Sequence, residues 1–71
     1  MSDRIMNNVC LLRSDRNITQ EDLALKVGVS RQTIIALEKG NYTPSILLAL
    51  KISHFFKTPV EEIFKIQKHE K

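Results

Sequence analysis

Apolar residues along this 71-residue chain recur at helical spacing in short segments. In NNVCLLRSDRN, Val9 and Leu12 lie three positions apart on one helical face, and Asn17 is suited to end the helix in a left-handed conformation. Pro44 and Ser45 introduce a second segment, SILLALKISHFFK. Its apolar positions cover a wide arc, as expected of a helix packed on several sides: Leu48, Ala49, Ile52, Phe55 and Phe56. The pattern predicts one helix in each segment.

Two further helix signals follow one another closely in the middle of the chain. Thr19 is suited to cap a helix whose first turn is acidic, and Gly28 is suited to end it, so a helix is predicted over Gln20–Val27. The hydroxyl of Ser30 can accept a hydrogen bond from the first amides of a next helix, which Gly40 ends. Only a few residues separate these two helices. This is the spacing of a helix-turn-helix motif.

The end of the chain carries signals for a last short helix and a strand. Pro59 suits the first position of a helix, and Thr58 with Glu61 three residues later has the pattern of a capping box. The following stretch IFKIQK alternates between apolar and polar residues, which indicates a terminal strand. Its candidate partner at the other end of the chain is the segment Ile5–Met6.

Two adjacent isoleucines raise a question about the second central helix. Successive helical residues are turned by about 100°, so Ile34 and Ile35 cannot both face one core. With Ile34 inward, Gln32 and Lys39 fall nearly opposite, with Ile35 and Ala36 on either side of them, so Ile35 faces outward. An exposed isoleucine is common on protein surfaces. Alternatively, this face enters the DNA major groove, where Gln32 offers its amide to adenine and Ile35 contacts a thymine methyl. Periodicity alone leaves both interpretations open.

Length and charge narrow the class of protein. The chain has room for a single domain, residues 1–71, near the size where one core is marginal and oligomerisation helps. Its 42% hydrophobic and 27% charged content is typical of a folded chain. A formal net charge of +3 permits a nucleic-acid partner without requiring one.

Several function classes are disfavoured by what the sequence lacks. Its longest apolar run, ILLAL, is far shorter than the roughly 20 residues of a membrane span, and MSDRIMNN lacks a signal-peptide pattern, so a cytoplasmic location is expected. Cys10 is the sole cysteine and is expected to be a packed, inert thiol. His54 and His69 are far apart and are expected to face solvent. No metal, cofactor or enzymatic activity is expected, because no metal-ligand cluster, catalytic grouping or glycine-rich phosphate loop occurs.

The stretch LLRSDRNITQEDLALKVGVSRQTIIALEKGNYTPSILLALKI closely resembles the Cro/C1-type (XRE-like) helix-turn-helix regulators of bacteria and phages. Its most specific elements are TQEDLA, GVSRQTI, EKGNYTPS and LALKIS, in order and without insertion, and the similarity runs from Asn7 to about Phe64. It is strongest to short stand-alone members such as the cytolysin repressor. The resemblance implies an all-α, five-helix, lambda-repressor-like DNA-binding domain with its helix-turn-helix at about residues 20–39. It also implies a small two-stranded antiparallel sheet built from the chain ends.

The resemblance also implies residue roles. Four residues match positions that contact bases: Arg31, Gln32, Ile35 and Ala36. Five match positions that contact the DNA backbone: Gln20, Thr33, Lys39, Asn41 and Tyr42. Arg13 and Glu38 match a pair that forms an internal salt bridge, so the carboxylate near the DNA surface is expected to be neutralised.

These matches imply a sequence-specific transcriptional regulator, expected to be a repressor that binds a palindromic double-stranded DNA operator as a homodimer. No small-molecule effector is evident, because the helix-turn-helix core uses almost the entire chain. The alternative is an antitoxin or phage-immunity protein with the same fold, whose main partner is another protein.

Two positions depart from the usual pattern of these regulators. Ile35 stands where relatives commonly carry a polar residue, so methyl contact is expected to contribute more to sequence preference than hydrogen bonding does. Leu47 stands where relatives usually carry Glu or Gln and shares a helical face with Lys51 and His54. It is either a lone exposed leucine or a contact to a partner. The candidates for a dimer surface are Leu47, Val60, Ile63 and Phe64.

Overall fold

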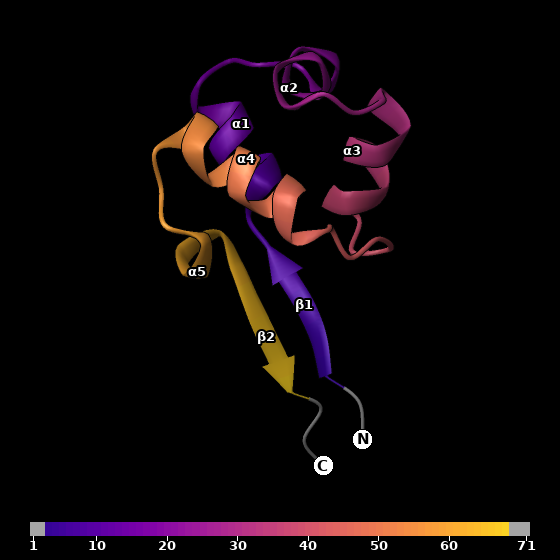
Figure 1. The fold of residues 1–71 in the computed structure, drawn as a ribbon, viewed down its shortest axis with the longest axis vertical. Coiled ribbons are helices and arrows are strands. Elements are labelled where there is room, and N and C mark those ends of the chain that lie inside the picture. Colours follow the sequence, from indigo (N-terminus) through magenta and orange to yellow (C-terminus); the bar gives the residue numbers. More distant parts are fainter. Residues whose placement is uncertain (1–2, 69–71) are drawn as a thin grey trace.

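Five helices and a two-stranded antiparallel sheet make up the protein, in a computed structural model that describes residues 3–68 (Figure 1). The elements in chain order are β1 (Asp3–Asn7), α1 (Val9–Asp15), α2 (Gln20–Val27), α3 (Arg31–Glu38), α4 (Ile46–Phe56), α5 (Val60–Ile63) and β2 (Phe64–Lys68). The predicted five-helix domain with a sheet built from the chain ends is therefore confirmed.

Three of the helices begin at capping hydroxyls, two of which, Thr19 and Ser30, the sequence predicts. The side chains of Thr19, Ser30 and Ser45 each accept a hydrogen bond from the backbone N–H three residues later, at 3.0, 3.2 and 3.1 Å. The two predicted left-handed terminators are also present, with φ of 56° at Asn17 and 78° at Gly28. Local signals thus fix most helix boundaries.

The capping box predicted at Thr58 is wrong. α5 begins after Pro59 and has no side-chain cap. α4 ends with Lys57 in a left-handed conformation, with φ of 54°, and the hydroxyl of Thr58 donates to the carbonyl of Phe56 at 3.0 Å. The Thr58 side chain therefore satisfies a free carbonyl at the end of α4 rather than an amide at the start of α5.

One hydrophobic core joins all five helices. Ile52 and Phe56 of α4 and Ile34 of α3 are completely buried, as are Val9 of α1 and Leu23 of α2. The remaining buried apolar residues are Ala24, Val27, Leu37, Leu48 and Ile63. The exposed face of α3 is positioned by this core. None of the helices within residues 3–68 is long and apolar enough to cross a membrane.

The sheet is tied to the helices at both of its inner ends. Ile5 of β1 lies opposite Ile66 of β2, and the strand pair extends away from the helical body (Figure 1). The backbone N–H of Asn8 donates to the carbonyl of Ile63 at 3.2 Å, which links the start of α1 to the end of α5. The side-chain amide of Asn7 donates to the carbonyl of Leu37 at 2.9 Å. β1 is therefore held directly against the end of α3.

Cys10 is exposed, so the prediction of a packed thiol is wrong. Its neighbour Val9 takes the core direction of α1, and the turn of about 100° between successive residues carries Cys10 toward the surface. Its Sγ lies 3.5 Å from Nη2 of Arg13. His54 is exposed, as expected, and His69 lies outside the described residues.

Candidate nucleic-acid interface

Local hydrogen bonds fix both ends of α2, and those at its C-terminal end form the turn to α3. Thr19 and Asp22 cap α2 reciprocally, each side chain accepting from the other residue's N–H. At the other end, the N–H groups of Gly28 and Val29 both donate to the carbonyl of Ala24, at 2.9 and 3.0 Å. The φ of 78° at Gly28 is what requires glycine there, since a Cβ would meet nothing closer than 3.7 Å. The turn fixes the direction in which α3 leaves α2.

α3 has one buried and one outward face, as its sequence predicts. Ile34 is 0% exposed and Leu37 is 1% exposed. The side chains of Arg31 and Gln32 are exposed, and neither makes a hydrogen bond or an ion pair with another described residue. Ile35 is half-buried at the edge of this face, as are Ala36 and Thr33. The face therefore offers two free polar side chains with small apolar surfaces beside them.

A nearly buried ion pair joins α1 to α3. Nε of Arg13 donates to Oε2 of Glu38 at 2.8 Å, and Nη2 donates to Oε1 at 3.1 Å, which is a two-point contact. The two side chains are 14% and 7% exposed. Nη1 of Arg13 also donates to the carbonyl of Ile18 at 2.8 Å, in the loop before α2. The arginine thus fixes three parts of the helical body relative to one another.

Gln20 has a different side-chain partner from the one expected. Its Nε2 donates to Oε1 of Glu38 at 3.1 Å, so this part of the side chain is turned toward the ion pair rather than left free for phosphate. Its backbone N–H is at the first position of α2, where the helix supplies no acceptor. This main-chain group is free to serve the role suggested for Gln20.

Hydrogen bonding keeps both members of the pair charged. Burial alone would raise the pKa of Glu38, but hydrogen bonds from Arg13 and Gln20 and the charge of Arg13 outweigh it and hold that pKa below its usual value. The hydrogen bond to Glu38 raises the pKa of Arg13. The carboxylate near the outward face of α3 is therefore neutralised locally by its own partner.

Stability is expected to depend on pH through Glu38. Because its pKa is lowered by folding, its stabilising contribution is fully present above the ordinary value near 4.3 and is lost as pH falls through the folded value. We expect Glu38→Gln to melt below the wild type at pH 7 and this gap to narrow below about pH 4. Thermal melts of both proteins across this range test it. A gap of the same size at pH 7 and at pH 3 would contradict this role of Glu38.

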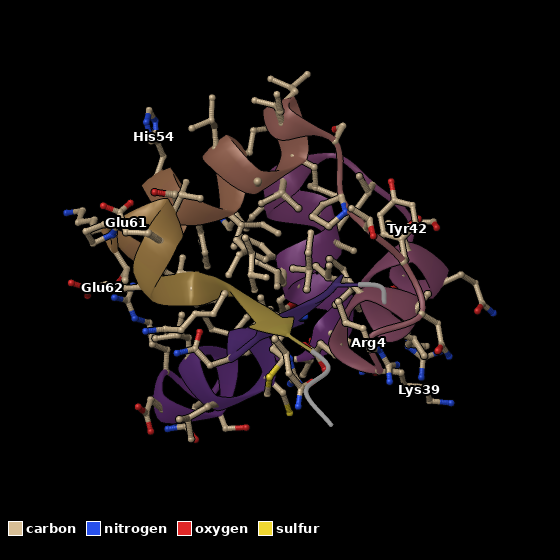
Figure 2. All side chains as sticks on the ribbon, turned by 90° about the horizontal axis from the view of Figure 1, so that it is seen from below. Arg4, Lys39, Tyr42, His54, Glu61 and Glu62 are labelled. Carbon is tan, nitrogen blue, oxygen red and sulfur yellow. The ribbon has the colours of Figure 1, made fainter. Side chains whose placement is uncertain are left out.

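The loop after α3 places polar and cationic groups beside the outward face. Gly40 has a φ of 82°, and the N–H of Asn41 donates back to the carbonyl of Ala36 at 2.9 Å, which closes the end of the helix. Lys39 and Asn41 are exposed, and Tyr42 is 41% exposed. Figure 2 shows Lys39 and Tyr42 on the same side of the molecule, together with Arg4. His54, Glu61 and Glu62 lie on the opposite side.

The four residues expected at a dimer surface differ in how exposed they are to solvent. Ile63 is 1% exposed and belongs to the core, so it offers no surface to a partner. Val60 and Phe64 are half-buried. Leu47 is 63% exposed and is not a lone leucine, because Ile46 and Leu50 on the same helix are 80% and 45% exposed. Sequence reasoning singled out only Leu47 on this face.

Two short helices joined by a glycine turn, the second with its polar face free, define a helix-turn-helix protein. The helix-turn-helix family profile matches residues 11–63, and the chain belongs to the Cro/C1-type helix-turn-helix family of transcriptional regulators. Members of this family are not enzymes.

Similar proteins occur in archaea and bacteria. An uncharacterized HTH-type transcriptional regulator of Methanocaldococcus jannaschii is 59% identical over 58 residues, which cover 82% of this chain and 88% of the relative. The cryptic phage CTXphi transcriptional repressor RstR of Vibrio cholerae is 35% identical over 52 residues, covering 73% of this chain and 47% of RstR. The crystal structure of the transcriptional regulator VanUg matches with a TM-score of 0.76 at 24% identity, covering 97% of this chain and 92% of VanUg. The VanUg match concerns the fold alone.

Proposed function

We propose that the protein binds a palindromic DNA operator as a homodimer and represses transcription. The observation that carries this proposal is the outward face of α3, on which Arg31 and Gln32 are exposed without partners among the described residues. An α-helix fits the major groove of B-form DNA, and free amide and guanidinium groups are the donors and acceptors that distinguish base pairs there. The name of the relative RstR, a transcriptional repressor, supports the direction of regulation.

The side chains on this face suit different base edges. Gln32 can bond to adenine at two points, and Arg31 can bond to the two acceptors of guanine. Ile35 and Ala36 carry methyl groups at the edge of the same face, which suit contact with thymine methyls. Base preference in this proposal therefore comes from two polar residues and two apolar ones.

Groups around α3 would set the position of the helix on the duplex. Lys39, Asn41 and Tyr42 follow α3, and Thr33 lies in the first turn of α3, where its hydroxyl is 3.1 Å from that of Ser30. The N–H of Gln20 lies at the start of α2, where free amides favour phosphate. Glu38 does not oppose phosphate binding, because Arg13 neutralises it. We infer that these contacts fix the register of the complex and carry no sequence information.

A homodimer would present two copies of α3 to half-sites about one duplex turn, or roughly 34 Å, apart. Leu47, Val60 and Phe64 remain the candidates for its surface, because each is at least partly exposed. Two-fold symmetry in the protein would then require a palindromic operator. Double-stranded DNA and a second copy are the partners proposed, without a small-molecule effector.

The exposed aliphatic face of α4 favours a second candidate function. Ile46, Leu47 and Leu50 place three large apolar side chains in water on one helix, a pattern that often marks a protein contact. An antitoxin or phage-immunity protein would use such a face for a different protein. A small protein that copurifies at a fixed stoichiometry, together with no selection of DNA sites, would favour this candidate over the operator-binding dimer.

Selection of binding sites from randomised duplex DNA at near-physiological salt tests the proposed function. Sequencing of the bound pool is expected to show an enriched palindrome with half-sites about one turn apart. A pool without any enriched sequence, obtained with folded protein, would contradict sequence-specific binding.

Lys39 is expected to act on all DNA sequences alike. Lys39→Ala should weaken binding to the operator and to unrelated duplex by the same factor, and it should reduce the slope of log affinity against log salt by about 0.9 per bound subunit. Fluorescence anisotropy at several salt concentrations measures both quantities. Lys57→Ala, in the α4–α5 loop, is the control and should leave the slope unchanged. Loss of affinity for the operator alone would instead place Lys39 among the base-contacting residues.

A further inference from the structure

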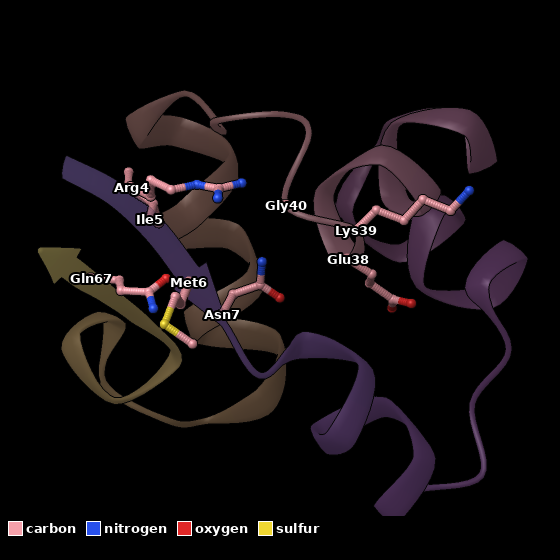
Figure 3. Close-up of a pocket in the computed structure, with 8 residues that line it drawn as sticks. All are labelled: Arg4, Ile5, Met6, Asn7, Glu38, Lys39, Gly40 and Gln67. Atoms are coloured by element: carbon pink, nitrogen blue, oxygen red, sulfur yellow. The ribbon is translucent and has the colours of Figure 1, made fainter. Parts of the chain in front are cut away.

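An open pocket lies between β1 and the end of α3 (Figure 3). It has a volume of about 240 Å³ and contains a charged residue that no sequence signal singled out, Arg4. Lys39 and Gly40 line it from the α3 side, and Asn7 lines it from the strand. Figure 3 shows the side chain of Arg4 extending from β1 toward the turn at Gly40. Two cationic residues that are 35 positions apart in sequence therefore border one depression.

The structure holds Arg4 in this place through the pairing of β1 with β2 and through the side chain of Asn7. β1 is paired with β2 over its whole length, with Arg4 opposite Gln67. Three residues along the strand, the side-chain amide of Asn7 donates to the carbonyl of Leu37 at 2.9 Å. The side chain of Asn7 also accepts from the N–H of Val9 at 3.0 Å, which anchors the strand to the start of α1. The position of Arg4 relative to the end of α3 is thus set by contacts that do not involve its own side chain.

The guanidinium of Arg4 has no partner among residues 4–67, the part of the chain whose side chains the structure describes. It is exposed and takes part in none of the side-chain hydrogen bonds or ion pairs of this part of the chain. Glu38, the acidic residue of the pocket lining, is committed to Arg13 at 2.8 Å and to Gln20 at 3.1 Å. Among these described side chains, the pocket therefore contains a cation without a partner, while Glu38 is already neutralised.

We infer that Arg4 binds a backbone phosphate of the DNA, next to the phosphates contacted by Lys39 and the loop after α3. This inference rests on the proposed function. The Arg4 guanidinium and the Lys39 ammonium lie on the same side of the molecule as Tyr42, away from Glu61 and Glu62 (Figure 2). A planar guanidinium binds phosphate through two parallel hydrogen bonds, a geometry that a lysine ammonium does not offer. The N-terminal strand is then part of the DNA-binding surface and adds affinity without sequence preference.

The test compares Arg4→Gln with Lys57→Gln, which removes the same single charge beyond the end of α4. The probe is a fluorescein-labelled duplex of random sequence, about 30 base pairs long, which is the length of two half-sites with flanks. We expect Arg4→Gln to bind about tenfold more weakly than the wild type, with the slope of log affinity against log salt reduced by about 0.9 per bound subunit. Lys57→Gln should match the wild type.

Two further measurements distinguish a phosphate contact of Arg4 from a purely structural role. Arg4→Lys should keep most of the salt slope but lose part of the affinity, which a purely structural role would not produce. The melting temperature of Arg4→Gln should equal that of the wild type, because the side chain makes no hydrogen bond or ion pair with residues 4–67. Unchanged affinity and slope in Arg4→Gln, with a wild type that binds, would overturn the inference. A wild type that binds neither this duplex nor any sequence in the randomised pool would overturn the proposed function instead.

Discussion

Replacing Arg13 by alanine is expected to lower the free energy of unfolding by about 2–3 kcal/mol. Removing one partner of a buried pair leaves an uncompensated charge, which typically costs about 3–5 kcal/mol, and the 14% exposure of Arg13 reduces that figure. The change also removes the donor to the carbonyl of Ile18. For a domain of this size the melting temperature should fall by roughly 10–20 °C. Thermal unfolding followed by circular dichroism measures it.

Two further variants show whether the pair itself is responsible. Arg31→Ala removes an arginine from an exposed position without internal contacts and should change stability by less than about 0.5 kcal/mol. The double variant Arg13→Ala with Glu38→Ala should cost less than the sum of the two single changes, because no charge is left unpaired. A melting temperature of Arg13→Ala equal to that of the wild type would show that the ion pair does not stabilise the fold. Additive losses would mean that each residue stabilises the fold separately.

Local chemistry made most of the fold predictable. The hydroxyls of Thr19, Ser30 and Ser45 can serve free amides three residues ahead with no help from the rest of the chain. Thr58 carries the same pattern, but its hydroxyl lies within 3.0 Å of the carbonyl of Phe56, which the end of α4 leaves free. A side chain between two helix ends has two possible uses, and the sequence cannot choose between them.

The candidate site was less predictable wherever it depends on distant contacts. The outward direction of Gln32 follows from helical geometry once Ile34 faces the core. The orientation of the Gln20 side chain toward Glu38 does not follow from helical geometry, because the two residues lie 18 positions apart on two helices. Arg4 reaches the end of α3 only through the contact between Asn7 and Leu37, which spans 30 positions. Such contacts carry no local pattern in the sequence.

Gln32→Ala is expected to remove most of the preference for the selected operator. A good two-point contact between a side chain and a base is worth about 1–3 kcal/mol, and a dimer loses it in both half-sites, so operator affinity should fall by about a hundredfold. Affinity for unrelated duplex should stay within about twofold, since that binding depends on phosphate contacts. Competition titrations with operator and random duplex at one salt concentration measure the ratio.

Ile35→Ala serves as the matched variant for this measurement. It removes apolar surface from the same face and should relax preference at a different base pair, where a thymine methyl is lost from the contact. Repeating the site selection with each variant therefore assigns each residue to a position in the half-site. If Gln32→Ala lost affinity equally for operator and random duplex, Gln32 would be a backbone contact. The bases would then be distinguished by Arg31, Ile35 and Ala36, and the axis of α3 would have to be rotated in the groove relative to the arrangement proposed here.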